Sequence, residues 1–543
     1  MSVILETVIA TLFTLGRVWI TIALSIITGW FLGYLAIKSH VVENIYVSLI
    51  EIFESVPVFS FLPIVLIFFV FTIGGNLGIQ LAVLFLVFTA VVWNIWMGIY
   101  QAYKTIPQDM LEVSENYRFS LMDKFSKLYI LYSMPRIASN LFPSFVNALF
   151  YITVSEVFSI GNSQYQVFGI GSLINYFVNN GLYNDALIGI VILIIWVIIF
   201  TLVLRELAEY IISRFGLDTE IKVRKRGRLS IRYSSRISSG LSTIVKLGKA
   251  FTIPVARRSV RQVRVEEEKE RSRAANLWKY VGISISVLIL SFILYGSISV
   301  IISVPLATWS YLVSNTPFAL LSIAVDYIRV AVVTLISLLI TIFLGYFIVV
   351  HKRIERVILP LIQIVAAIPA PVYFPFLYAF SISFISHLFG AFTNEFYVLL
   401  LGFLSTFYYS FFSYYIGVTS MPVQFWEIMK NYELSFWQKL RQIILPSTMP
   451  YLITGITSTV NSTWGGLAIA EYWPNITQDH NLYVRTGLMK DIVLFTNQGE
   501  IALASWFSLI FAIVVVVYSI LFTRKLMDLA RKKYIAEEGV YLA

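Results

Sequence analysis

Long apolar runs dominate this sequence and restrict its fold more than any other feature. A segment of about 20 apolar residues can cross a lipid bilayer as a helix. About eleven such runs occur, near residues 8–36, 54–73, 79–102, 137–160, 184–204, 277–303, 320–350, 360–381, 394–417, 451–472 and 501–523. Only 13% of the 543 residues are charged, whereas soluble globular proteins are about a quarter charged. We therefore predict an all-α polytopic membrane protein with about 11 transmembrane helices.

The distribution of basic residues predicts the orientation. The net charge is +10, and the excess is concentrated between Arg205 and Lys279 and after Arg524. If the N-terminus lies outside, these segments, Lys38 and the sequence HKRIER at 351–356 all face the cytoplasm. Lys and Arg prefer cytoplasmic loops, so we predict a multi-pass plasma-membrane protein with its C-terminus in the cytoplasm. The same preference accounts for the basicity, and we predict no binding of nucleic acid.

The chain contains an internal repeat. A polar, helix-compatible segment at 106–135 separates two apolar runs and has a counterpart at 421–450, and we call these segments the first and second elbow. Each elbow starts with a proline, has a glutamate five residues later and ends at a proline that starts the next apolar run. The matching positions are 315 residues apart: Pro107 and Pro422, Glu112 and Glu427, and Pro135 and Pro450. Such regular spacing indicates a duplication.

The repeat extends into the apolar runs. Further pairs are Arg17 and Arg329, and Pro57 and Pro369, which are 312 residues apart, and Glu156 and Glu471, which are 315 apart. Both elbows face the same side only if one additional span precedes the second copy. We therefore predict two parallel five-helix repeats, at 1–210 and 306–543. A basic cytoplasmic linker at 211–276, which would contact anionic lipid, and an extra transmembrane helix at 277–305 would join them.

The elbows resemble the EAA loop in the membrane subunits of type I ABC importers. That loop opens with Glu-Ala-Ala, has a glycine a few residues later and ends in Leu-Pro before a transmembrane helix. The second elbow is similar to it at Glu427, Leu445-Pro446 and Pro450, and the first at Glu112 and Pro135. Arg118 and Glu433 replace the glycine, which is the usual residue where φ is positive, so the geometry of this turn stays open.

Other stretches resemble the nitrate/sulfonate/taurine branch of that family. They are the prolines Pro57/Pro63 and Pro369/Pro375, the segment Ser155-Glu156 followed by GIGSLI at 169–174, and its partial copy at Ala470-Glu471 and Gly487-Leu488. The resemblance extends over about residues 8–210 and 315–530. It implies a fused permease for a small anionic or zwitterionic solute. It also implies two ABC ATPase subunits bound at the elbows and an extracytoplasmic solute-binding protein.

The first set of candidate site residues lies in the elbows. An amphipathic helix can lie in a groove of a partner protein, with apolar side chains as anchors. A carboxylate near the start of such a helix is stabilised by the helix dipole and could also meet a basic residue of the partner. We predict ATPase coupling by Glu112, Ser114, Tyr117, Arg118, Phe119, Glu427, Met429, Tyr432, Glu433 and Leu434. An amphipathic loop helix without a partner is the alternative.

The second set would line or gate the translocation path: Arg17, Arg329, Pro57, Pro369, Glu156 and Glu471. A charge inside the bilayer is costly and usually faces protein or water. The arginines could instead snorkel and pair with a carboxylate such as Asp326 or Glu6. The two glutamates could pair with the arginines, contact a delivery protein or simply lie at the interface. The prolines could bend helices at the path, or only affect packing.

The sequence contains none of the patterns expected of an enzyme. It has no cysteine, no pair of histidines at ligand spacing and no GxxxxGK[ST] loop. We therefore predict no catalytic, metal or cofactor site in this chain, with ATP and Mg bound by partner ATPase subunits. The predicted function is the permease component of an ATP-driven importer. The alternative is an ion-coupled secondary transporter, for which Asp326 and Glu156 would be the coupling carboxylates.

Overall fold

The computed structural model describes residues 2–55, 58, 65–160, 163–215, 304–477, 480–518, 521–522 and 525. The predicted linker at 211–276 beyond residue 215 and the predicted extra helix at 277–305 before residue 304 lie outside the described residues. Pro57 also lies outside them.

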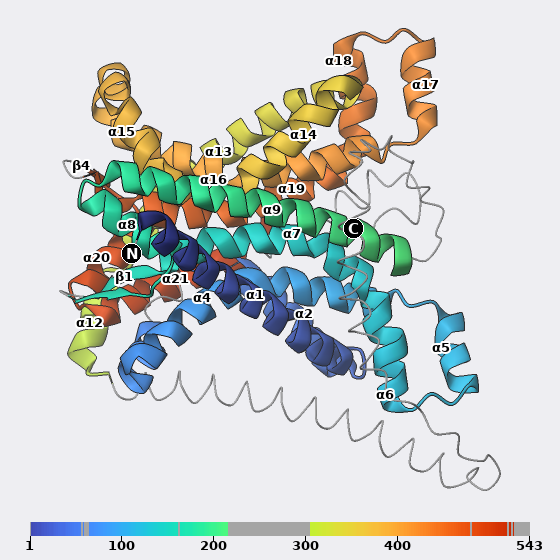
Figure 1. The fold of residues 1–543 in the computed structure, drawn as a ribbon, viewed down its shortest axis with the longest axis horizontal. Coiled ribbons are helices and arrows are strands. Elements are labelled where there is room, and N and C mark those ends of the chain that lie inside the picture. The colour runs from blue at the N-terminus through green and yellow to red at the C-terminus, as the bar shows by residue number, and fades with distance from the viewer. Residues whose placement is uncertain are drawn as a thin grey trace, which may run out of the picture.

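Long helices that run in one general direction make up most of the structure (Figure 1). The first repeat contributes α1 (Val3–Ala36), α4 (Gly75–Lys104), α7 (Ile130–Ser155) and α9 (Tyr183–Phe215). The second repeat contributes α13 (Thr316–Val350), α16 (Thr393–Thr419), α19 (Leu445–Ala470) and α21 (Ile501–Tyr518). Within the described residues, eight helical stretches are long and apolar enough to cross a membrane. This confirms the prediction of an all-α polytopic membrane protein.

One of the predicted apolar runs does not form a single helix. The run at 360–381 is divided between α14 (Lys352–Ala367) and α15 (Ala370–Phe389). Ile368 is extended, with φ −79° and ψ 120°, because Pro369 disfavours helical geometry in the residue before it. In the first repeat, the described parts of the corresponding region are α2 (His40–Ser55) and a π-helical segment, Leu66–Ile73.

A β-hairpin follows α7 and another follows α19. The first hairpin pairs β1 (Val157–Ile160) with β2 (Ser163–Gln166), and the second pairs β3 (Tyr472–Thr477) with β4 (His480–Tyr483). The predicted span at 137–160 was therefore wrong at its end, since the helix stops at Ser155. Each hairpin leads into a short helix, α8 (Ile170–Asn179) or α20 (Leu488–Asn497). A further short helix, α12 (Leu306–Ser314), precedes α13.

The elbows and the hairpins lie at opposite ends of the molecule. The first elbow contains α5 (Gln108–Asn116) and α6 (Leu121–Lys124), and the second contains α17 (Val423–Asn431) and α18 (Phe436–Gln438). Figure 1 shows both elbows at the right-hand end, and the hairpins with α8 and α20 at the left-hand end. The N-terminus lies toward the hairpin end. The two repeats are therefore parallel in the structure.

The two repeats share an apolar core. One cluster of buried side chains combines Phe150 and Tyr151 of α7 with Trp464 of α19 and many neighbours in the second repeat. Within that repeat, a Cβ added to Gly466 would lie 2.9 Å from the Cα of Gly402, so α16 and α19 pack in close contact. Small residues allow helices in a membrane to approach closely and gain packing energy. The contact between the repeats is thus part of the core that holds each repeat together.

Candidate functional site

The turn in each elbow keeps a left-handed residue although it lacks glycine. Arg118 has φ 51° and Glu433 has φ 46°. In the first elbow, the Phe119 N–H donates to the Ser114 carbonyl and the Arg118 N–H donates to the Glu115 carbonyl, both at 2.9 Å. The equivalent bonds of the second elbow measure 3.3 and 3.2 Å. This pair of bonds defines a Schellman C-cap, which normally places glycine at the left-handed position. The elbow geometry is therefore retained in both copies.

A capped second helix follows the turn. The Ser120 hydroxyl accepts a hydrogen bond from the Asp123 N–H at 3.1 Å. In the second elbow, Ser435 and Gln438 form a reciprocal capping box, with bonds of 2.8 and 3.4 Å. Such caps satisfy N–H groups that a helix start leaves unpaired. The second helix of each elbow then continues through a π-helical segment into a long helix. This segment is Phe125–Tyr129 before α7 and Lys439–Ile444 before α19.

The predicted coupling residues differ in exposure. Tyr117 and Tyr432 are 76% and 75% exposed, so both rings project from the turn. By contrast, Ser114 and Met429, which occupy the same position in the two copies, are 2% and 3% exposed and face the inside of the elbow. The remaining residues are either exposed (Glu112, Arg118, Glu427 and Glu433) or half-buried (Phe119 and Leu434).

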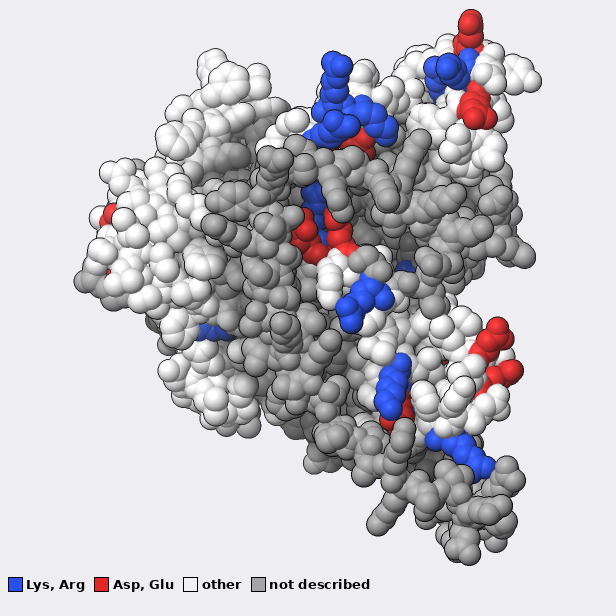
Figure 2. Space-filling model, turned by 45° about the vertical axis from the view of Figure 1, so that its right-hand side comes forward, with Lys and Arg blue, Asp and Glu red and all other residues white. Residues whose placement is uncertain are grey.

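The elbows also expose apolar and charged groups beside the predicted coupling residues listed above. Met122 is 74% exposed in the first elbow, and Trp437 is 65% exposed in the second. A groove in the first elbow is lined by Asp109, Met110, Val113, Ser114, Phe119, Lys127 and Leu128. In Figure 2, charged side chains gather toward the right-hand side of the molecule, where the elbows lie. The elbow end thus combines apolar anchors with charge.

The hairpin end of the first repeat contains a buried ion pair. Arg17 Nη1 lies 3.2 Å from Glu156 Oε1, and Glu156 is fully buried. The carboxylate also accepts hydrogen bonds from the Thr14 hydroxyl at 2.6 Å and from the Gly171 N–H at 2.7 Å. Arg17 donates a further bond to the Phe168 carbonyl at 3.0 Å. The pair therefore ties α1 to the end of α7 and to the start of α8.

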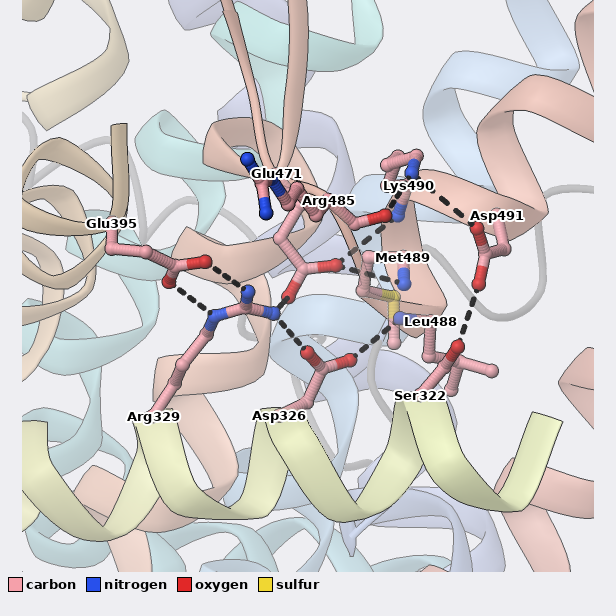
Figure 3. Close-up of polar contacts among 10 residues, drawn as sticks. All are labelled: Ser322, Asp326, Arg329, Glu395, Glu471, Arg485, Leu488, Met489, Lys490 and Asp491. Atoms are coloured by element: carbon pink, nitrogen blue, oxygen red, sulfur yellow. Dashed lines mark hydrogen bonds and ion pairs between the residues drawn. The ribbon is translucent and has the colours of Figure 1, made fainter. Parts of the chain in front are cut away.

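The second repeat has an equivalent cluster with more acids (Figure 3). Arg329 Nη1 lies 2.6 Å from Asp326 and 3.5 Å from Glu471. Its other two nitrogens donate to the two oxygens of Glu395, at 2.9 and 2.7 Å. The first two N–H groups of α20 donate to Asp326 at 2.8 Å and to Glu471 at 3.1 Å. One arginine is thus surrounded by three carboxyl groups.

The repeat spacing relates the two clusters position by position: Thr14 to Asp326, Arg17 to Arg329, Gln80 to Glu395, and Glu156 to Glu471. Gln80 completes the first cluster by accepting a bond from Arg17 at 3.2 Å. Two neutral side chains of the first cluster are therefore acids in the second. Burial raises the pKa of Glu156 to about 7. Burial and, after it, the charge of Asp326 raise the pKa of Glu471 above its usual range.

These contacts place the predicted path residues. Arg17 pairs with Glu156 rather than with Glu6, and Arg329 pairs with both Asp326 and Glu471. The structure therefore brings the arginines and the glutamates together, at the hairpin end of each repeat. Pro369 lies elsewhere, at the break between α14 and α15. The sequence analysis missed Thr14, Gln80 and Glu395. The repeat spacing of 312 applied to Asp326 could have pointed to Thr14.

The arrangement matches a known family. A family model described as "Binding-protein-dependent transport system inner membrane component" matches the chain twice, at residues 25–216 and 337–533. The chain belongs to this family. The two matches cover most of the chain, with one match in each repeat. This permease therefore contains an internal duplication, as the residue spacing predicted. Searches of curated proteins and of solved structures returned no significant match. The permease is thus a multi-pass membrane component of a binding-protein-dependent transport system.

Proposed function

We propose that this permease forms the complete membrane channel of an ATP-driven importer. One ABC ATPase subunit binds to each of the two elbows. An extracytoplasmic binding protein delivers a small solute at the hairpin end. ATP and Mg are held by the ATPase subunits. The motif resemblance favours the nitrate/sulfonate/taurine branch. In this proposal the elbow end and the C-terminus face the cytoplasm, and the N-terminus lies outside.

The observation that carries the proposal is the placement of two equivalent elbows at one end of the molecule. Each presents a tyrosine about three-quarters exposed, Tyr117 or Tyr432, beside a rigid left-handed turn. A soluble partner can bury such an aromatic anchor in a groove. When two ATPase subunits close on ATP, the elbows would move together, and the repeats would rock as rigid bodies about their shared core.

Affinity purification tests the assignment of the elbows. The tagged permease should retain its ATPase subunits through purification, and the double variant Tyr117→Ala/Tyr432→Ala should lose them. Tyr176→Ala is a matched control, because Tyr176 is 53% exposed but lies on α8 at the hairpin end. If all three proteins retain the ATPase equally, or retain none, the elbows are not the docking sites.

Transport assays test the coupling. In proteoliposomes that contain the ATPase subunits, Glu112→Ala/Glu427→Ala should preserve ATP hydrolysis and reduce uptake, because both carboxylates are exposed on the first helix of an elbow. Unchanged coupling would argue against their role. The alternative, an ion-coupled carrier, needs carboxylates that are free to exchange ions. Asp326 and Glu156 are instead engaged with arginines and backbone N–H groups. Uptake driven by an ion gradient without ATPase subunits would favour that alternative.

A further inference from the structure

The same hydrogen bond occurs near the elbow in both repeats. The Tyr100 hydroxyl on α4 donates to Glu43 on α2 at 2.6 Å, and the Tyr415 hydroxyl on α16 donates to Glu355 on α14. The tyrosines are 315 residues apart and the glutamates 312, so the repeat spacing relates the two bonds to each other. A hydroxyl bond to a carboxylate is short and about twice as strong as a neutral one. We call each of these bonds a clasp.

A lysine lies beside each carboxylate but comes from a different place in the two copies. Lys104 Nζ, at the end of α4, lies 2.7 Å from Glu43, whereas Lys352 Nζ lies 3.2 Å from Glu355 of its own helix. The repeat spacing relates Lys104 to Thr419, so the two lysines are not equivalent. The bond between tyrosine and glutamate is therefore the contact that both copies share.

Each clasp lies directly before an elbow. Tyr100 is four residues before the end of α4 at Lys104, and Tyr415 is four residues before the end of α16 at Thr419. Four residues correspond to about one helical turn. Only one residue then separates each helix from its elbow. The start of α2 or α14 is thus fastened to the helix that carries the elbow of the same repeat.

The far ends of α2 and α14 reach the opposite repeat. α14 contacts α7 and α9, and its last residues, Ala366 and Ala367, belong to a buried cluster made mostly of first-repeat side chains. α2 contacts α21, and Val58 and Val65, which follow α2, belong to a buried cluster made mostly of second-repeat side chains. We call α2 and α14 the crossing helices, because each starts in one repeat and leads into the core of the other.

We propose that the two clasps transmit the movement of each elbow to the core of the opposite repeat. The inference rests on the proposed transport function, and it assigns Tyr100, Glu43, Tyr415 and Glu355 as positioning residues. When an ATPase subunit displaces an elbow, the clasp makes the crossing helix move with the helix that carries that elbow. Because the crossing helix is packed in the opposite core, the two repeats then move against each other as units, and neither elbow bends alone.

Distances from pulsed EPR in nanodiscs test this inference on the full-length permease with its ATPase subunits. The chain has no cysteine, so introduced cysteines are the only sites that take a thiol-reactive spin label. The pair Gln108→Cys/Val423→Cys reports on the elbows, and in a second protein the pair Asn180→Cys/Gln498→Cys reports on the hairpin end. All four residues are exposed. In the parent, ATP with vanadate should change both distances.

Removal of the clasps should separate the two movements. In Tyr100→Phe/Tyr415→Phe, the elbows should still bind the ATPase subunits and still move with ATP. The ratio of switched to unswitched hairpin ends should fall by about 2- to 30-fold, which is the range by which substitutions in a coupling network change the coupling. Glu43→Ala/Glu355→Ala removes the other partner of each bond and should give the same loss.

Tyr397→Phe is the matched control for the loss of a buried hydroxyl group. Tyr397 lies on the same helix as Tyr415, and its hydroxyl shares a hydrogen bond of 2.8 Å with Ser381 of α15. This variant should keep both movements of the parent. A parental hairpin response in either clasp variant, or an equal loss in the control, would overturn the inference. If the elbows of the parent do not move with ATP, the proposed function itself is wrong and the clasps have no movement to transmit, so the two failures are distinct.

Discussion

Replacing Arg17 with glutamine tests the central claim about the hairpin end. The change leaves Glu156 fully buried without its cation, which lies 3.2 Å away in the parent. At an effective dielectric constant of about 20, the lost attraction is about 5 kcal/mol. This is an upper limit, because the buried carboxyl can take up a proton instead of staying charged.

Protonation of Glu156 determines how much stability Arg17→Gln loses and how this loss depends on pH. Burial raises the pKa of Glu156 to about 7 from its usual value of about 4.5. A raised pKa makes the parent lose stability as pH rises from about 4.5 to about 7, and the loss then stops. Without Arg17 the pKa is higher still, so the loss continues by about 1.4 kcal/mol per pH unit. The parent and the variant should therefore diverge above pH 7.

A second contribution does not depend on pH. The Phe168 carbonyl loses its part-buried hydrogen bond from the charged Arg17, and a bond of this kind contributes about 1–3 kcal/mol. At pH 8 the two contributions together predict a loss of about 2–4 kcal/mol in the free energy of unfolding. Titration with SDS in mixed micelles, followed by the fluorescence of the 12 tryptophans, measures this quantity.

The double variant Arg17→Gln/Glu156→Gln is the matched control. It removes the charge as well as its partner, so its stability should not fall further between pH 7 and pH 9. The reasoning is refuted if the difference between the parent and Arg17→Gln is the same at pH 6 and pH 9. It is also refuted if the double variant keeps the pH dependence of the single one.

Three further changes have expected outcomes in the same unfolding assay. Glu433→Gly should stabilise the second elbow by about 0.5–1 kcal/mol. It relieves about 1–2 kcal/mol of left-handed backbone strain, and the greater freedom of glycine in the unfolded chain costs about 0.5–1 kcal/mol on folding. Destabilisation would contradict the observed turn. The double variant Asp326→Thr/Glu395→Gln gives the second cluster the side chains of the first. It should stabilise the folded permease more at pH 9 than at pH 6, because it removes the charge of Asp326, which together with burial raises the pKa of Glu471. A pH-independent effect would contradict the assigned contacts. Gly171→Ala should cost about 1–3 kcal/mol, because its Cβ would lie 2.1 Å from a backbone oxygen of α7, whereas Gly16→Ala has open space and should be harmless; equal effects would contradict the packing of α8.

The repeat and the helical architecture could be predicted from local patterns in the sequence. Apolar runs of membrane-spanning length identify helices because the bilayer core excludes unpaired backbone groups. The spacing of 315 between Glu112 and Glu427 identified the elbows, and the structure gives both the same turn at Arg118 and Glu433. The division of one run at Pro369 was missed, although the effect of proline on the preceding residue is local and could have predicted it.

The tertiary structure decided which side chains meet. Glu156 pairs with a residue 139 positions earlier, and hydropathy carries no information about such a contact. Ser114 and Met429 resemble surface residues of an amphipathic helix until the fold of the elbow buries them. A cavity lined by Asn147 of the first repeat and Tyr409 of the second exists only because these distant parts of the chain pack against each other. A sequence specifies its membrane spans through the burial preference of each segment, whereas ion pairs and cavities arise from distances between segments that only the folded chain establishes.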